Sequence, residues 1–142
     1  MSAPRPHPGP LGFLWLFFNP IGRVSREPYW LALGFLWCVF AIPMTIWLSG
    51  ADISSPEAME LALANIIRNH PSMPIMLFAF QWVELALVIK RLQDKGLTGL
   101  LAILVFVPLL NVLLLFALGF LPGDRGPNAY GPGPNSRWQR PK

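Results

Sequence analysis

Two long stretches without a charged residue constrain most strongly what this chain can fold into. One runs for 20 residues from Tyr29 to Leu48, and the other for 23 residues from Gly99 to Leu121. About 20 apolar residues match the hydrocarbon layer of a bilayer. Hydrophobic residues make up 54% of the 142-residue chain and charged residues only 13%. A soluble domain of this length could not bury so much apolar surface, so we expect an all-α integral membrane protein.

Three hydrophobic helical segments are expected, with spans at about residues 29–48, 74–91 and 99–121. The second is the shortest, and the terminal Lys90 and Arg91 would lengthen it by extending their charges to the membrane interface. Pro108 interrupts the third segment. This segment is therefore either one kinked span, which its length favours, or a broken, re-entrant hairpin of two half-helices.

The rest of the chain divides around these segments. Residues 1–10 alternate proline with small or polar residues, which predicts a disordered arm. Residues 11–18 are apolar and aromatic but too short to span, so we expect an amino-terminal interfacial helix. The membrane domain should cover residues 11–134, and residues 135–142 should form a flexible tail.

The loop between the first two spans contains a helix signal. Ser54 to Glu57 has the spacing of a capping box, with a proline near the first helical turn. Apolar residues then recur at helical spacing until Asn69, His70 and Pro71 end the pattern. We expect a short amphipathic helix on the membrane surface.

The distribution of positive charge predicts the orientation. Arg68 is the one cation between the first two spans, whereas three cations precede the first span and three follow the second, namely Arg5, Arg23 and Arg26, then Lys90, Arg91 and Lys95. Since cations collect in cytoplasmic loops, the amino terminus should be cytoplasmic. Four further cations follow the third segment. A re-entrant third segment would return them to the cytoplasmic side, so the charge rule favours the hairpin.

Three polar motifs flank the hydrophobic segments, at residues 22–30 (GRVSREPYW), 90–99 (KRLQDKGLTG) and 122–132 (PGDRGPNAYGP). In this order they resemble the domain-of-unknown-function 805 family of small bacterial inner-membrane proteins, with its motifs G-R-x-x-R-x-x-Y-W, R-L-H-D-x-G-x-S-G-W and P-G-x-x-G-x-N-x-Y-G-x-x-P. The match runs from Leu11 to Pro134. The family's histidine is Gln93 here and its second tryptophan is Leu100. The resemblance implies the fold and the location but no reaction.

These motifs supply a candidate site on the cytoplasmic face, made of Arg23, Arg26, Arg91, Asp94, Asn128 and Tyr130. The structural interpretation is that the cations flank the membrane and that Arg91 and Asp94 close a tight turn by an ion pair. The functional alternative is a site for a phosphate or an anionic lipid headgroup held by the three arginines.

An acidic residue within a span is costly and usually faces the protein interior. Glu84 lies in the second hydrophobic segment, and Gln81 and Asn111 are the other intramembrane polar candidates. We expect a structural polar contact of Glu84 with Asn111 or Gln81. The alternative is that Glu84 belongs to an ion pathway.

The sequence contains no recognisable catalytic constellation, phosphate loop or metal-ligand cluster, so we expect neither an enzyme nor a cofactor. A structural, interaction or regulatory protein of the bacterial inner membrane is the leading hypothesis. The alternatives are a subunit of a small transporter or channel with Glu84 in the pathway, and an enzyme acting on lipid. Expected partners are the lipid bilayer, including anionic headgroups, and a second copy or another membrane protein. The cations are too scattered for nucleic-acid binding.

Overall fold

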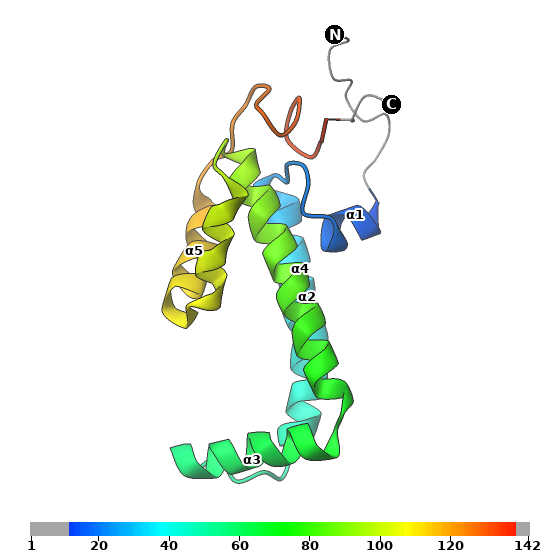
Figure 1. Cartoon of the computed structure of the whole chain (residues 1–142), viewed down its shortest axis with the longest axis vertical. Helices are drawn as coiled ribbons and strands as arrows, with labels where there is room; N and C mark the ends of the chain where they lie inside the picture. The colour runs from blue at the N-terminus through cyan, green and yellow to red at the C-terminus, as the bar shows by residue number, and fades with distance from the viewer. Residues whose placement is uncertain (1–11, 139–142) are drawn as a thin grey trace.

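The computed structural model describes residues 12–138, and its regular secondary structure is helical (Figure 1). The elements are α1 (Phe13–Phe18), α2 (Arg26–Leu48), α3 (Pro56–Asn69), α4 (Ser72–Asp94), the 3-10 helix η1 (Gly99–Phe106) and α5 (Pro108–Phe120). The expectation of an all-helical chain is confirmed. The predicted arm over residues 1–10 and residues 139–142 of the predicted tail lie outside the described residues.

Helices α2 and α4 form the long axis of the molecule and run antiparallel, side by side (Figure 1). Each has 23 residues, which gives a length of about 35 Å at the usual rise of an α-helix. By length and composition both could cross a membrane. Helix α2 begins three residues before the predicted span and ends with it at Leu48, whereas α4 extends past its predicted span at both ends. The extension at the carboxyl end of α4 carries Asp94, which is held by the contacts described below.

The third hydrophobic segment is a hairpin of two helices (Figure 1). Val107 has extended backbone angles between η1 and α5, as expected for a residue that precedes a proline, and Pro108 begins α5. The hairpin starts and finishes near the carboxyl end of α4, since Asp124 N donates to Asp94 O at 2.8 Å. Its arms are about 16 Å and 20 Å long at ordinary helical rises, so neither matches the thickness of a bilayer.

The two remaining helices lie at opposite ends of the α2–α4 pair (Figure 1). Near the hairpin base, α1 packs on α4. At the far end, α3 lies across the tips of the long helices. The predicted helix start is confirmed, but the cap is Ser55 rather than Ser54, so the capping-box register is off by one residue: Ser55 Oγ accepts a hydrogen bond from Ala58 N at 3.1 Å. The predicted end of this helix is confirmed at Asn69.

The apolar core lies where α2, α4 and the hairpin meet, and includes Tyr29, Leu33, Leu87, Val105 and Leu115. The outward faces of the same helices carry exposed large apolar side chains along their length. Only 17% of the most apolar window of α2 and 33% of that of α4 are buried within the molecule. The helices are therefore far more apolar than their packing within this chain requires.

Candidate functional site

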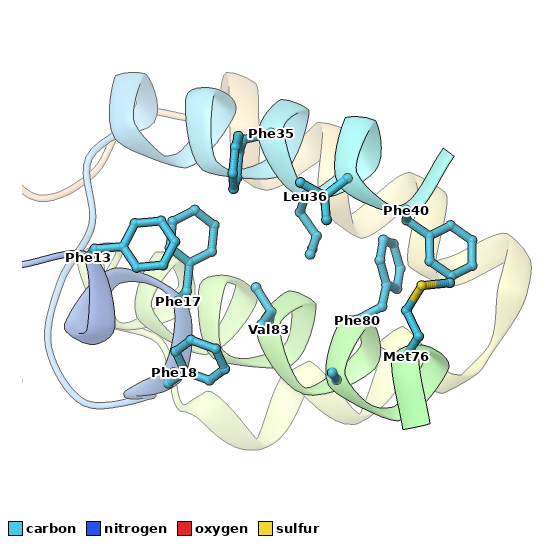
Figure 2. Close-up of a pocket in the computed structure, with 11 residues that line it drawn as sticks. Phe13, Phe17, Phe18, Phe35, Leu36, Phe40, Met76, Phe80 and Val83 are labelled. Atoms are coloured by element: carbon cyan, nitrogen blue, oxygen red, sulfur yellow. The ribbon is translucent and has the colours of Figure 1, made fainter. Parts of the chain in front are cut away.

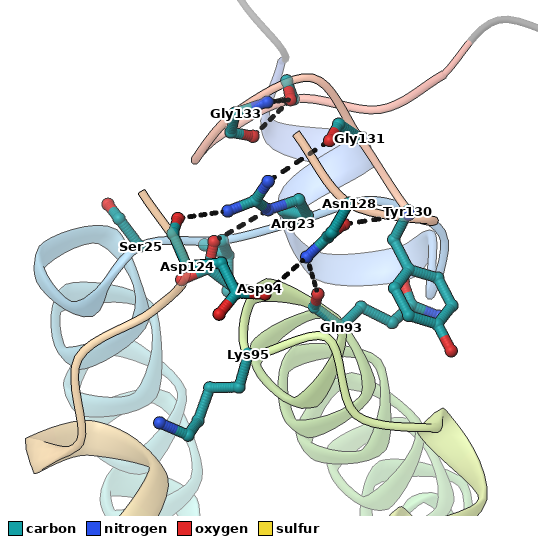
Figure 3. Close-up of polar contacts among 12 residues, drawn as sticks. Arg23, Ser25, Gln93, Asp94, Lys95, Asp124, Asn128, Tyr130, Gly131 and Gly133 are labelled. Atoms are coloured by element: carbon teal, nitrogen blue, oxygen red, sulfur yellow. Dashed lines mark hydrogen bonds and ion pairs between the residues drawn. The ribbon is translucent and has the colours of Figure 1, made fainter. Parts of the chain in front are cut away.

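The three sequence motifs meet at the carboxyl end of α4, around Asp94 (Figure 3). Asp94 is only 1% exposed. Its Oδ1 accepts a hydrogen bond from Arg23 Nε at 3.1 Å, and its Oδ2 is paired with Arg91 Nη1. The predicted ion pair of Arg91 with Asp94 is therefore present, joined by a second arginine that sequence reasoning did not assign to it. We refer to Arg23, Arg91 and Asp94 as the Asp94 cluster.

Arg23 ties the carboxyl-terminal segment to the cluster (Figure 3). Its Nη2 donates to Asp124 O at 2.5 Å, and its Nη1 donates to the carbonyl oxygens of Gly126 and Gly131 at 2.7 and 3.2 Å. With the bond to Asp94, four of the five donors of a guanidinium are used. The side chain is fully buried, and it connects the carboxyl end of α4 to the segment that follows α5.

Arg91 holds the end of the hairpin. Its Nε donates to Leu118 O at 2.8 Å, its Nη2 donates to Leu121 O at 2.5 Å, and its Nη1 also reaches Val24 O at 3.3 Å. The last carbonyl groups of a helix have no partner within the helix and attract cations. Arg91 therefore satisfies the carboxyl end of α5 while it is paired with Asp94.

Lys90 binds backbone carbonyl groups of α1 in a similar way. Its Nζ donates to Trp15 O at 2.7 Å and to Leu16 O, and lies 4.6 Å from the centre of the Trp15 ring. The expectation that Lys90 and Arg91 extend outward to the interface is wrong, because both side chains are fully buried. Carbonyl groups near the carboxyl ends of α1 and α5 offer them partners inside the protein.

Asn128 connects the third motif to the second, and Gln93 connects the second to the first (Figure 3). Asn128 Nδ2 donates to Gln93 O at 2.9 Å and to Asp124 Oδ2 at 3.2 Å, while Asn128 Oδ1 accepts from Tyr130 N at 2.9 Å. Gln93 Oε1 accepts from Gly22 N at 3.1 Å. Asn128 and Tyr130 are both predicted site residues. Asn128 contributes its side chain to these contacts, whereas Tyr130 contributes its backbone N–H and has a half-buried side chain.

Arg26 is the predicted site residue that the structure does not bring to the cluster. It is exposed at the first residue of α2, and its side chain makes no hydrogen bond with the described residues 12–138. Since Arg23 and Arg91 are buried and engaged, the three arginines do not form one open anion site. Of these three arginines, Arg26 alone has an exposed side chain that an external headgroup can reach.

Two glycines permit this packing. A Cβ atom at Gly123 would collide with the carboxylate of Asp94. Gly96 has a φ of +69° at the turn that ends α4, a conformation that favours glycine. Both positions belong to the motifs identified in the sequence.

Residues 135–138, at the start of the predicted flexible tail, also contact the first motif. Ser136 O accepts from Arg23 N at 2.8 Å, and Asn135 Oδ1 accepts from Ser25 N at 2.8 Å. Trp138 Nε1 donates to Asn128 O at 2.9 Å. Turn residues alone suggested a loose tail, but Asn135 and Ser136 have specific partners far away in the sequence, and Trp138 is bonded to the third motif.

Tyr29 and Trp30 dock α5 on α2, a role that sequence reasoning missed. Tyr29 Oη donates to Leu115 O at 3.1 Å and Trp30 Nε1 donates to Gly119 O at 3.1 Å. A side chain at Gly119 would overlap the Trp30 ring. The sequence signal was their position at the end of the first motif, but aromatic residues at a helix end more often indicate an interfacial belt.

The intramembrane polar candidates come together as expected. Glu84 Oε2 accepts from Gln81 Nε2 at 3.3 Å, and both carboxyl oxygens lie 3.4–3.5 Å from Asn111 Nδ2. Glu84 is 1% exposed. The contact joins the middle of α4 to the first turn of α5, well away from the Asp94 cluster.

An apolar groove of about 200 Å³ opens between α1, α2 and α4 (Figure 2). The labelled lining includes Phe17 from α1, Phe35 and Phe40 from α2, and Phe80 and Val83 from α4. Elsewhere, the part of the chain that the structure describes contains no group of three or more His, Cys, Asp or Glu side chains that could hold a metal ion.

These features define a class: a helical protein with two long apolar helices, an adjoining apolar hairpin and a buried polar cluster where three loop motifs meet. The chain belongs to the family described as protein of unknown function (DUF805), whose model matches residues 17–132. The family resemblance expected from the ordered motifs is thereby confirmed. Neither the curated proteins nor the solved structures contain a match to this chain.

Proposed function

We propose that this chain is a two-span protein of the bacterial inner membrane, with α2 and α4 crossing the bilayer. The proposal rests on the exposure of their apolar faces, for example at Leu31, Ile42, Ile75 and Phe78. Water would penalise so large an apolar surface, whereas lipid would not. In this arrangement the hairpin enters the membrane from one side and returns, and α1 and α3 lie at the two interfaces.

The distribution of charge supports an orientation with both described ends of the chain in the cytoplasm. The end with the Asp94 cluster has seven cations and three acids, namely Arg23, Arg26, Lys90, Arg91, Lys95, Arg125 and Arg137, with Glu27, Asp94 and Asp124. The end with α3 has Arg68 against three acids, namely Asp52, Glu57 and Glu60. The hairpin brings the carboxyl-terminal cations back to the positive end, as the positive-inside rule favours.

We further propose that the protein acts by interaction, as a structural or regulatory partner of another membrane protein or of a second copy, without a reaction of its own. The observation that carries this proposal is the use of the motif side chains inside the molecule. Arg23 and Arg91 donate their hydrogen bonds to Asp94 and to backbone carbonyl groups. The cluster is therefore built to hold a particular fold rather than to receive a substrate.

The experiment that tests this function is purification from the native membrane after mild crosslinking, with quantification of what accompanies the protein. We expect one membrane protein, or a second copy, in constant ratio to the chain. An Arg26→Ala variant serves as the control for headgroup binding, because Arg26 lies outside the cluster. A protein that is purified without a partner, yet turns over a lipid substrate, contradicts the proposal.

A second candidate function is a subunit of a small transporter or channel, which the buried position of Glu84 beside Asn111 favours. Acids within spans often mark ion or proton pathways. In this case, proton or cation flux in vesicles that contain the purified protein should depend on Glu84.

A further inference from the structure

The hydrogen bonding around Glu84 is incomplete in a specific way. The three donor distances to its carboxyl oxygens are 3.3, 3.4 and 3.5 Å, longer than the usual 2.7–3.2 Å of an N–H···O bond. Asn111 Oδ1 is buried and has no donor among the described residues. Two neighbouring acceptor groups are therefore poorly satisfied. The Glu84 carboxyl group accepts only long hydrogen bonds, and Asn111 Oδ1 accepts none from the described residues.

No charged partner compensates for a carboxylate at this position. The hairpin offers none, because η1 and α5 contain no titratable side chain, and neither does α1. From α2 the titratable group nearby is Tyr29, whose hydroxyl already donates to Leu115 O. Along α4, Arg91 is two helical turns away and is engaged by Asp94 and by carbonyl groups.

A single proton would complete this set of bonds. A protonated carboxyl group has one O–H donor and keeps an acceptor oxygen, whereas an amide offers one acceptor and two donors. Asn111 Nδ2 lies almost equally far from the two carboxyl oxygens. A small rotation of this amide would place Nδ2 against one carboxyl oxygen and Oδ1 against the other, so that the two side chains form a pair with two hydrogen bonds.

We propose that Glu84 and Asn111 form a proton-binding site, in which the protonated Glu84 carboxyl donates to Asn111 Oδ1 and accepts from Asn111 Nδ2. This inference goes beyond the proposed function and does not depend on it. Among the hydrogen bonds of the described residues, those to Glu84 are the ones that fasten residues 99–114 to α4. The bound proton therefore adds a second hydrogen bond to the attachment of the inner half of the hairpin, and its loss leaves Asn111 Oδ1 without a donor.

Infrared spectroscopy of the purified full-length chain in lipid nanodiscs tests the proposal, because a protonated carboxyl group absorbs apart from an ionised one. At neutral pH, where exposed acids are ionised, we expect a protonated-carboxyl band that Glu84→Gln removes. The matched control Glu27→Gln changes an exposed acid of α2 and should keep the band. Asn111→Leu should keep the band but shift it to higher frequency, because the carboxyl group then loses its amide partner.

Three results would overturn the proposal. The first is the absence of a protonated-carboxyl band at neutral pH in the correctly folded wild-type chain, which needs no variant. The second is a band that stays at the same frequency in Asn111→Leu. The third is a band that disappears when choline chloride is replaced by sodium chloride at constant pH, since a metal cation would then occupy the site in place of the proton.

Discussion

Arg23 Nε and Asp94 Oδ1 lie 3.1 Å apart, although 71 residues separate them in the sequence. This bond closes the proposed cytoplasmic end of the molecule, because it connects the segment before α2 to the last residue of α4. Asp94 is the shared acceptor for two buried guanidinium groups. The stability of this end of the molecule should therefore depend on one carboxylate.

The first prediction concerns that carboxylate. Asp94→Ala leaves two buried cations without their counter-charge, and breaking a buried ion pair in this way costs about 3–5 kcal/mol. We expect a large loss of folded yield and a lower unfolding temperature in detergent. Lys95→Ala is the control, because Lys95 Nζ makes one exposed bond to Pro122 O. Equal, small effects of the two changes would show that the turn is merely a solvated loop.

The second prediction concerns Gly123. In Gly123→Ala the new methyl group meets the Asp94 carboxylate and approaches Arg91 Nη1, so the cluster must open or shift. Overpacking of this kind usually costs about 1–3 kcal/mol. Gly126→Ala, in the same loop, meets no atom within 4 Å and should unfold at the wild-type temperature. Thermal unfolding of the two variants side by side gives the comparison, and a Gly126 variant that is the less stable would contradict the predicted packing.

The third prediction concerns the departure from the family motif at Gln93. Its Oε1 accepts from Gly22 N, and an unprotonated imidazole nitrogen can accept in the same way. We expect Gln93→His to keep the wild-type unfolding temperature near neutral pH and to lose stability in acid, where both imidazole nitrogens become donors. Gln93→Leu removes the acceptor and should be destabilised by about 1 kcal/mol at any pH. Identical pH profiles for the His and Leu variants would exclude this role.

The fourth prediction separates the two candidate functions at Glu84. Glu84→Gln keeps the shape and most of the hydrogen-bonding capacity but removes the titrating group. We expect unchanged expression, oligomeric state and partner binding. We also expect no proton or cation flux in reconstituted vesicles that depends on Glu84. Flux with the wild-type chain that the Gln variant abolishes, without loss of fold, would favour the transporter or channel subunit.

Local signals in the sequence predicted local structure well. The start of α3 followed from Ser55 and Pro56, because a cap and a first-turn proline act within one helical turn. Pro108 marked the break in the third segment for a similar reason. Both effects depend on neighbours a few residues away, which are visible in the sequence.

Contacts between residues far apart in the sequence were harder to predict from the sequence. The pairing of Arg91 with Asp94 was predictable from their spacing of three residues, whereas that of Arg23 with Asp94 was not, since many cations could face one acid. The inward direction of Lys90 was missed because its partners are backbone carbonyl groups of α1, which every residue carries. Tyr29 and Trp30 were missed as docking residues because the same residue types also form interfacial belts.

The central claim is that α2 and α4 cross the membrane and that the hairpin returns to the side it came from. Cysteine labelling in intact cells tests it directly, with single cysteines at Lys95, Arg125 and Glu57 in a Cys38→Ser background. Lys95 and Arg125 bracket the hairpin, and Glu57 lies in α3. We predict that a membrane-impermeant reagent labels only the Glu57 position, and that the other two are labelled only after the membrane is permeabilised. Labelling of the Arg125 position from outside would contradict the account, because the third segment would then cross the bilayer.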